Sequence, residues 1–195
     1  MIYWIAYGLL KICSELFFPI KVYGFKNLPK KGAYILASNH ESYIDPIVIG
    51  LSCRRKICYM AKDSLFRNKF VSVVLNQVGA FPIKRGASDI GAIKITLKIL
   101  KEGVPVVLFP EGTRIVSQKR THGGVGLITA QSGVPVIPVF IKGSDRVLPK
   151  GAKFLKRHKV KIFLGPVVRF KEFSSAHQIA DHIMGKIRSL QESSS

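Results

Sequence analysis

A histidine and an aspartate five residues apart, His40 and Asp45, stand in a short polar stretch between two apolar runs. Five helical steps of about 100° would leave such side chains about 140° apart, so they cannot share one face of an α-helix. They can meet only across a turn, with the histidine on a strand-to-helix loop and the aspartate at the start of the helix. An aspartate there could hold the imidazole so that its other nitrogen faces outward as a base.

The same residues permit a second interpretation, in which Asp45 before Pro46 only caps a helix and His40 is an ordinary loop histidine. The two interpretations are compatible if one carboxylate oxygen starts the helix and the other holds the imidazole.

Two further groups of polar residues follow apolar runs. They are Lys84 and Arg85 after residues 80–83, and Glu111, Gly112, Thr113 and Arg114 after residues 104–109. If these runs are strands parallel to the one that precedes His40, their ends meet at one edge of a sheet, where sites form in such folds. Arginines there could hold a phosphate by charge-assisted hydrogen bonds. Taken singly, each residue could also be a solvated surface charge or part of an ordinary turn.

The elements that must position these residues alternate along the chain. We expect strands at 21–25, 33–38, 56–61, 80–83, 104–109, 134–141 and 160–164, and helices at 45–53, 65–77, 90–102, 125–132 and 176–190. This alternation predicts an α/β fold with a mostly parallel central sheet flanked by helices. The strand at 134–141 contains two prolines, which favours an edge or irregular position. We predict one domain of residues 21–192, preceded by a helix within residues 1–20.

Residues 1–20 are mostly apolar, but Lys11 and Glu15 interrupt the middle. A bilayer span needs about twenty apolar residues, so we do not expect a transmembrane helix. The segment also lacks the basic start and the small-residue cleavage site of a signal peptide. We expect an amphipathic helix in the membrane interface; a helix packed on the domain without membrane contact is the alternative.

The chain is strongly basic, with 31 Lys and Arg against 11 Asp and Glu and a formal net charge of +20. This predicts an anionic partner. Ten basic residues lie between positions 142 and 171, where Asp145 is the only acid, and anionic lipids, an acidic carrier protein or the phosphates of coenzyme A would be attracted there. No zinc-finger, RNA-binding or helix-turn-helix pattern supports nucleic acid. The three cysteines lack metal-site spacing, which favours reduced thiols.

Four segments resemble the conserved blocks of the glycerolipid acyltransferase family. Residues 39–45 match its N-H-x-x-x-x-D signature, residues 79–85 resemble a second block that ends in arginine, residues 109–114 match F-P-E-G-T-R, and residues 134–139 resemble an apolar block with prolines. Order and spacing agree over roughly residues 21–165, and the layout is closest to the bacterial 1-acyl-sn-glycerol-3-phosphate acyltransferase branch. The sequence departs from the family at Ile115, where serine is common, and at Thr121-His122, where Phe-Lys is usual.

The resemblance implies transfer of a fatty acyl group from acyl-CoA or acyl-acyl carrier protein to the sn-2 hydroxyl of lysophosphatidic acid, which gives phosphatidic acid. His40 would be the general base and Asp45 would orient it. The acceptor would be bound by Lys84, Arg85, Glu111, Gly112, Thr113 and Arg114. The resemblance implies no metal, no cofactor and no covalent acyl-enzyme, and a peripheral or monotopic place at the cytoplasmic face of the cell membrane.

The motifs do not decide the acceptor. Glycerol 3-phosphate, a lysophospholipid or a lyso-aminolipid would suit the same chemistry. A non-catalytic basic module that binds membranes or nucleic acid is the alternative from another functional class, and it would leave the histidine–aspartate pair unexplained.

Overall fold

The computed structural model describes residues 2–53, 55–77, 79–83, 90–110, 123–149, 151–152, 154–170 and 175–194. These residues contain a seven-stranded sheet with the order β1-β7-β6-β2-β5-β3-β4. The strands are β1 (Ile20–Tyr23), β2 (Ile35–Ser38), β3 (Cys58–Lys62), β4 (Ala80–Ile83), β5 (Val106–Leu108), β6 (Val136–Lys142) and β7 (Val160–Leu164). The helices are α1 (Ile2–Phe17), α2 (Asp45–Ser52), α3 (Lys69–Gln77), α4 (Ile90–Lys101), α5 (Gly123–Ser132), α6 (Ser144–Val147) and α7 (Ala176–Glu192), with 3₁₀ turns at Phe25–Asn27 and Asp63–Arg67.

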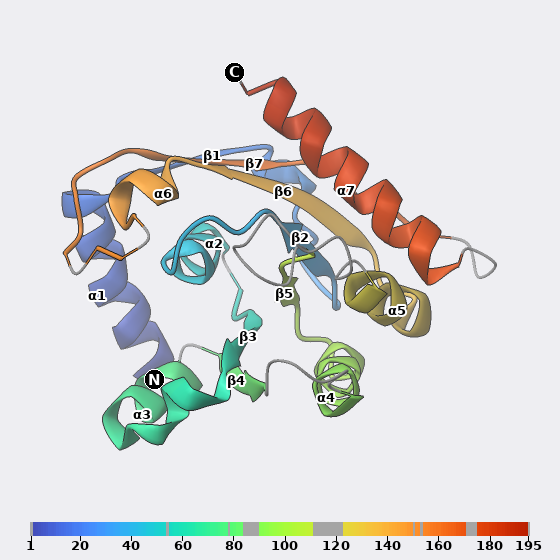
Figure 1. Cartoon of the computed structure of the whole chain (residues 1–195), viewed down its shortest axis with the longest axis horizontal. Helices are drawn as coiled ribbons and strands as arrows, with labels where there is room; N and C mark the ends of the chain where they lie inside the picture. The colour runs from blue at the N-terminus through green and yellow to red at the C-terminus, as the bar shows by residue number, and fades with distance from the viewer. Residues whose placement is uncertain are drawn as a thin grey trace.

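The predicted α/β fold is confirmed, and its sheet is mixed. Strands β6, β2, β5, β3 and β4 are mutually parallel, whereas β7 runs antiparallel to β6 and pairs in parallel with β1 at the edge. The carboxyl ends of β2, β5 and β4 therefore lie along one edge of the sheet, as the sequence predicts. In Figure 1 the chain leaves β2 and turns into α2, which is seen beside β2.

Helices cover both faces of the sheet (Figure 1). Strand β2 contributes side chains to the core on each face of the sheet, because successive side chains of a strand point to opposite faces. Leu36 belongs to a core with the apolar side of α2 and part of α1, whereas Ile35 and Ala37 belong to a second core with α4, α5 and α7. All three side chains are fully buried. Such two-sided burial makes β2 a rigid base for the loop that follows it.

Two positions are expected for the proline-containing strand, an edge or an irregular one; the edge is wrong, because β6 is an inner strand between β7 and β2. Pro138 accepts a hydrogen bond from Gly165 N at 2.8 Å through its carbonyl, so its nitrogen, which has no hydrogen, faces the same way, toward β7. There β7 has ended at Leu164, and pairing resumes only at an isolated bridge between Val136 and Val168. The nitrogen of Pro138, which cannot donate a hydrogen bond, thus lies where the pairing between β6 and β7 is interrupted, so the proline can be accommodated in an inner strand.

Other differences from the predicted elements are local. The expected helix at 65–77 is a 3₁₀ turn followed by α3, and the short helix α6 has no counterpart among the predictions. Among the described residues, no helix combines the length and apolar character that crossing a bilayer requires. The division into a segment of residues 1–20 and a domain of residues 21–192 stays a prediction.

Candidate active site

The ends of two neighbouring parallel strands form the centre of the candidate site. In the register of the β2–β5 pair, Ala37 lies opposite Leu108, so the residues after β2 and β5 leave the sheet side by side. Strand β2 leads to His40, and β5 leads to Phe109 and Pro110. The predicted acceptor-binding residues Lys84 and Arg85, which follow β4, lie outside the described residues, as do Glu111, Gly112, Thr113 and Arg114, which follow Pro110.

His40 and Asp45 meet across the turn between β2 and α2. His40 Nδ1 lies 2.9 Å from Asp45 Oδ2, and the side chains are 10% and 0% exposed. The same oxygen accepts hydrogen bonds from the backbone amides of Glu41 and Ser42, each at 2.8 Å. Because amides only donate, this oxygen acts as an acceptor, and Nδ1 completes the set by donating its hydrogen. This hydrogen-bond pattern favours a hydrogen on Nδ1, directed at the carboxylate, and places Nε2 on the side of the ring away from Asp45.

Asp45 organises the loop in a way that differs from the capping prediction. The N-cap of α2 is Ile44, which makes no side-chain capping bond, and Asp45 is the first helical residue with Pro46 behind it. The turn is closed instead by Oδ2, which accepts hydrogen bonds from the two loop amides and from the imidazole. The predicted sharing of roles between two carboxylate oxygens is therefore wrong: among the described residues, Oδ1 has no hydrogen-bond partner.

Asn39 anchors the loop to β6, a function that the sequence reasoning missed. Its side chain accepts a bond from Ile141 N at 2.8 Å and donates one to Ile141 O at 2.9 Å. The amide thus imitates a strand residue and extends the pairing of β2 with β6 past its last register pair, Ser38 with Val139. A weaker bond at 3.2 Å runs from Asn39 Nδ2 to Glu41 Oε1. Asn39, the asparagine of the signature, therefore ties the loop that carries His40 to the neighbouring strand β6.

Phe109 provides a second support for the imidazole. Its ring stacks on that of His40, with centroids 4.2 Å apart and planes inclined by 25°. The first residue of the F-P-E-G-T-R segment thus contacts the histidine of the N-H-x-x-x-x-D segment. The sequence contained the signal, since both blocks follow predicted parallel strands, but a ring contact between positions 69 residues apart cannot be read from spacing.

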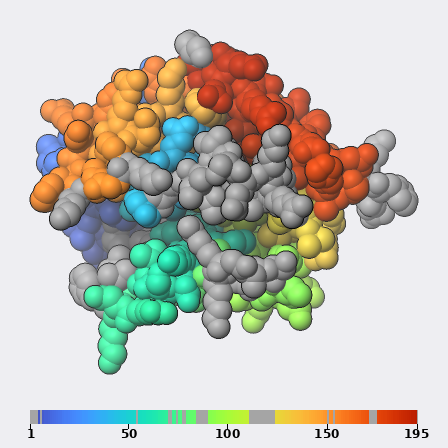
Figure 2. Space-filling view, in the orientation of Figure 1, coloured from blue at the N-terminus to red at the C-terminus, as the bar shows by residue number. Residues whose placement is uncertain are grey.

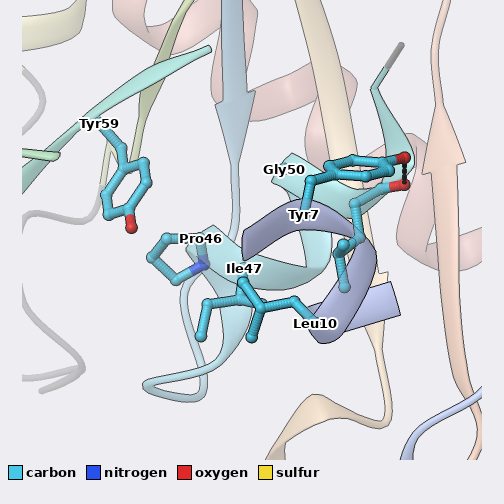
Figure 3. Close-up of a pocket in the computed structure, with 7 residues that line it drawn as sticks. Tyr7, Leu10, Pro46, Ile47, Gly50 and Tyr59 are labelled. Atoms are coloured by element: carbon cyan, nitrogen blue, oxygen red, sulfur yellow. Dashed lines mark hydrogen bonds between the residues drawn. The ribbon is translucent and has the colours of Figure 1, made fainter. Parts of the chain in front are cut away.

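An apolar pocket lies beside the start of α2. It is lined by Tyr7 and Leu10 of α1, by Pro46, Ile47, Gly50 and Leu51 of α2, and by Tyr59 of β3. Figure 3 shows the α1 and α2 side chains converging, with the Tyr7 hydroxyl donating a hydrogen bond to Leu51 O at 3.1 Å. The pocket's lining residue Pro46 follows Asp45 in the chain. Among the described residues, no group of His, Cys, Asp and Glu has the arrangement of a metal site.

The comparisons with known proteins identify the family. A family model described as Acyltransferase matches residues 19–142, which include both segments that meet at His40. The chain belongs to the acyltransferase family.

Relatives of this acyltransferase carry more specific names. It is 31% identical over 166 residues to the 1-acyl-sn-glycerol-3-phosphate acyltransferase of Bacillus subtilis, covering 85% of this chain and 81% of the relative. The protein of the same name from Borreliella burgdorferi is 27% identical over 182 residues, covering 88% and 73%. In structure, it matches the 1-acyl-sn-glycerophosphate acyltransferase PlsC from Thermotoga maritima with a TM-score of 0.81 and 26% identity, over 99% of this chain and 80% of that one. The acyltransferase thus shares its fold with that enzyme.

Proposed function

We propose that this acyltransferase moves a fatty acyl group from a thioester to the sn-2 hydroxyl of 1-acyl-sn-glycerol 3-phosphate and so makes phosphatidic acid. The observation that carries the proposal is the buried contact between His40 Nδ1 and Asp45 Oδ2 at the carboxyl edge of the sheet, which would orient Nε2 to act as the base. The names of the relatives from B. subtilis and B. burgdorferi support the acceptor.

The reaction needs one base and no protein nucleophile, because the acceptor brings its own hydroxyl. His40 Nε2 takes the hydroxyl proton while the oxygen attacks the thioester carbonyl. The tetrahedral intermediate collapses, the C–S bond breaks, and the thiolate receives the proton from the imidazolium. Asp45 stabilises the positive charge that His40 carries between these steps. A positioned general base of this kind typically contributes about 10²–10⁴-fold to the rate.

The acceptor phosphate needs cations at the same edge. We propose that Arg85 and Arg114 hold it, with Lys84 and Thr113 beside them, that Glu111 bonds an acceptor hydroxyl or orients an arginine, and that Gly112 permits a sharp turn. Strand β5 adjoins β2, whereas β4 is three strands from β2, or about 14 Å at the usual spacing. The end of β5 is therefore the closer of the two to His40, which favours Arg114 for the phosphate oxygens nearest the reacting hydroxyl.

Contact with the membrane would bring the lipid substrates to this edge. Helix α1 exposes Ile5, Leu9, Ile12 and Leu16, which are 57%, 65%, 71% and 61% exposed. Their spacing of four, three and four residues puts them within about 60° of one another around the helix. We propose that this apolar stripe of α1 inserts into the interface of the cell membrane, on its anionic cytoplasmic face. The apolar pocket of Figure 3, between α1 and α2, has a volume of about 30 Å³, so it could take the end of an acyl chain but not its whole length.

An acceptor panel tests the proposed reaction. Purified protein with an acyl-CoA donor should form product fastest from 1-acyl-sn-glycerol 3-phosphate, more slowly from glycerol 3-phosphate, and least from lysophosphatidylcholine or monoacylglycerol, as measured by mass spectrometry of extracted lipids. A preference for an acceptor that lacks a phosphate would contradict the proposed acceptor while leaving acyl transfer itself in place.

Liposome co-sedimentation tests the α1 stripe. Leu9→Gln with Ile12→Gln should reduce binding to phosphatidylglycerol vesicles about tenfold or more, because each buried leucine-sized side chain contributes about 1.5–3 kcal/mol. Ile90→Gln with Ile95→Gln, at exposed positions of α4, is the matched control and should bind like the wild type. High salt should sharpen the difference because it screens the basic residues. Equal sedimentation of the two variants would show that α1 is no anchor.

A further inference from the structure

Three lysines lie side by side across the three strands β1, β7 and β6. Lys21 is paired with Lys161 in the β1–β7 register, and Lys161 is paired with Lys142 in the β7–β6 register. Neighbouring strands are about 4.8 Å apart, and like charges directly opposite each other destabilise a sheet. Among the described residues, none of these lysines forms an ion pair with a carboxylate. A row of this kind is costly unless an anion binds to it.

Three aromatic rings form a parallel row two residues further along the same strands, and therefore on the same face of the sheet. Tyr23 stacks on Phe163 with centroids 4.8 Å apart and planes inclined by 5°, and Phe163 stacks on Phe140 at 6.3 Å and 30°. Tyr23 and Phe163 are only half-buried, so their rings reach solvent. The two rows together make one surface, the lysine–aromatic face, with cations on one side and flat apolar rings on the other.

The cations act on the aromatic row. Lys21 Nζ lies 5.0 Å from the centroid of the Tyr23 ring. The hydrogen bond from Lys21 lowers the pKa of the Tyr23 hydroxyl below its ordinary value, and the charges of Lys161 and Lys159 act in the same direction. A positive field therefore extends over rings that could stack on a heterocycle.

A cleft extends from this face to Glu41, on the loop that carries His40. It has a volume of about 480 Å³, within the usual range of ligand pockets. Lys142, Arg146, Lys159 and Lys161 line it together with Phe140, while Glu41 and Asp145 are the acids on its wall. The backbone amide of Glu41 donates to Asp45 Oδ2 at 2.8 Å, so one wall of the cleft belongs to the loop that holds the histidine–aspartate pair. Figure 2 shows the gold and orange segments that carry most of these residues beside the red C-terminal end of α7, where Lys142 donates to Ser194 O at 2.9 Å.

We propose that the lysine–aromatic face and its cleft bind the nucleotide part of coenzyme A as the acyl donor. The adenine stacks at Tyr23 and Phe163, the diphosphate and the 3′-phosphate contact the lysine row, and the pantetheine arm follows the cleft past Glu41 to His40. This assignment rests on the proposed function, because it names the donor of that reaction. An acidic carrier protein would use the charges but would leave the aromatic row without a role, and the membrane-facing stripe on α1 is a separate surface.

Direct titration with coenzyme A tests the lysine row. Lys21→Gln with Lys161→Gln should weaken binding about tenfold in calorimetry, and should raise the KM for acyl-CoA by a similar factor. Lys98→Gln with Lys101→Gln, which removes the same charge from the far part of the molecule on α4, should stay within twofold of the wild type. The row variant should fold normally, since it relieves a like-charge contact. Equal affinity of the two variants for coenzyme A would overturn the assignment.

A second variant separates stacking from charge. Tyr23→Leu should weaken the binding of adenosine 3′,5′-bisphosphate by about fivefold or more, in line with typical base–aromatic stacking, and should leave turnover of a nucleotide-free acyl-N-acetylcysteamine thioester unchanged. Unchanged binding of the bisphosphate would contradict the adenine site. Loss of activity only with acyl-acyl carrier protein, at unaltered affinity for coenzyme A, would assign the face to the carrier protein instead and so overturn the proposal.

The proposed reaction and the donor site can fail separately. Tight coenzyme A binding that depends on the lysine row, without acylation of 1-acyl-sn-glycerol 3-phosphate, would reject the acceptor and support the site. Acylation of that acceptor with wild-type affinity for coenzyme A in the row variant would support the reaction and reject the site.

Discussion

Replacing Asp45 by asparagine is the sharpest small change that the structure offers. The two side chains have nearly the same shape, and the carboxylate is completely buried, so the substitution removes charge and little else. Oδ2 accepts three hydrogen bonds, from the imidazole of His40 and from two loop amides. An amide oxygen in its place can still accept all three, but as a neutral group.

The magnitude follows from those three bonds. A hydrogen bond to a charged partner contributes about 1.5–3 kcal/mol and one between neutral groups about 0.5–1.5 kcal/mol, so each bond loses about 1 kcal/mol. We expect Asp45→Asn to lower the free energy of unfolding by about 3 kcal/mol. In catalysis the imidazolium loses its counter-charge. The comparable change in a serine protease triad lowers kcat about 10⁴-fold, and we expect a loss of about 10²–10⁴ here.

The assay combines urea denaturation with initial rates of acyl transfer well below the unfolding midpoint. The chain provides a matched control, because His177 and Asp181 form a second histidine–aspartate pair on α7, at 3.4 Å, with side chains 81% and 57% exposed. Asp181→Asn should change stability by less than about 1 kcal/mol and leave kcat within twofold, since exposed ion pairs contribute little. A folded Asp45→Asn variant that keeps kcat within threefold of the wild type would refute the role assigned to the carboxylate.

Three further predictions concern the anchor at Asn39, the contact between α5 and α7, and the buried thiol of Cys53. Asn39→Ala should lower the free energy of unfolding by about 2–4 kcal/mol in urea denaturation, because it leaves the buried N–H and C=O of Ile141 in β6 without their side-chain partner. A loss below about 0.5 kcal/mol would contradict the anchoring role. Gly126→Ala should destabilise by about 1–3 kcal/mol, because its Cβ would overlap a carbonyl oxygen at the start of α7, whereas Gly185→Ala on α7, with open space, should stabilise by about 0.5–1 kcal/mol. Equal effects of the two glycine changes in thermal unfolding would show that α5 and α7 do not approach so closely. Burial raises the pKa of the Cys53 thiol to about 12, so at pH 8 only about 1 in 10⁴ is thiolate, and iodoacetamide should label it far more slowly in the folded than in the urea-unfolded protein, as followed by mass spectrometry.

The local geometry of the site could be predicted from the sequence because its determinants are local. An apolar run that stops at Ser38 and a proline at position 46 bracket the turn, so the meeting of His40 and Asp45 required no knowledge of the rest of the fold. The shared edge of β2 and β5 was predictable as well, since alternating strands and helices imply parallel strands. The roles of the two residues in catalysis, and of the residues that follow β4 and β5, stay predictions.

Features that depend on register and on distant contacts could not be predicted. Asn39 bonds to Ile141, 102 residues away, and this requires β6 to lie beside β2. The two prolines of residues 134–141 favoured an edge or irregular strand from composition alone. Only the register shows that Pro138 faces an interruption of β7. The sharing of one carboxylate oxygen by three donors depends on ångström-scale placement that residue types do not encode.

The lysine–aromatic face illustrates the same limit. The sequence predicts a basic region between positions 142 and 171, but Lys21 lies 121 residues before Lys142 and shares a row with it only through the pairing of β1, β7 and β6. A count of charges therefore identifies the class of partner, an anion, whereas the register supplies the arrangement that distinguishes one anion from another.

Whether His40 is the base is tested by the rate of phosphatidic acid formation by His40→Ala, measured with saturating 1-acyl-sn-glycerol 3-phosphate and acyl-CoA. We expect a loss of about 10²–10⁴ in kcat with a nearly unchanged KM for the acceptor, while His177→Ala, at the exposed pair on α7, keeps the wild-type rate. A folded His40→Ala protein that turns over as fast as His177→Ala would contradict the assignment of His40 as the base.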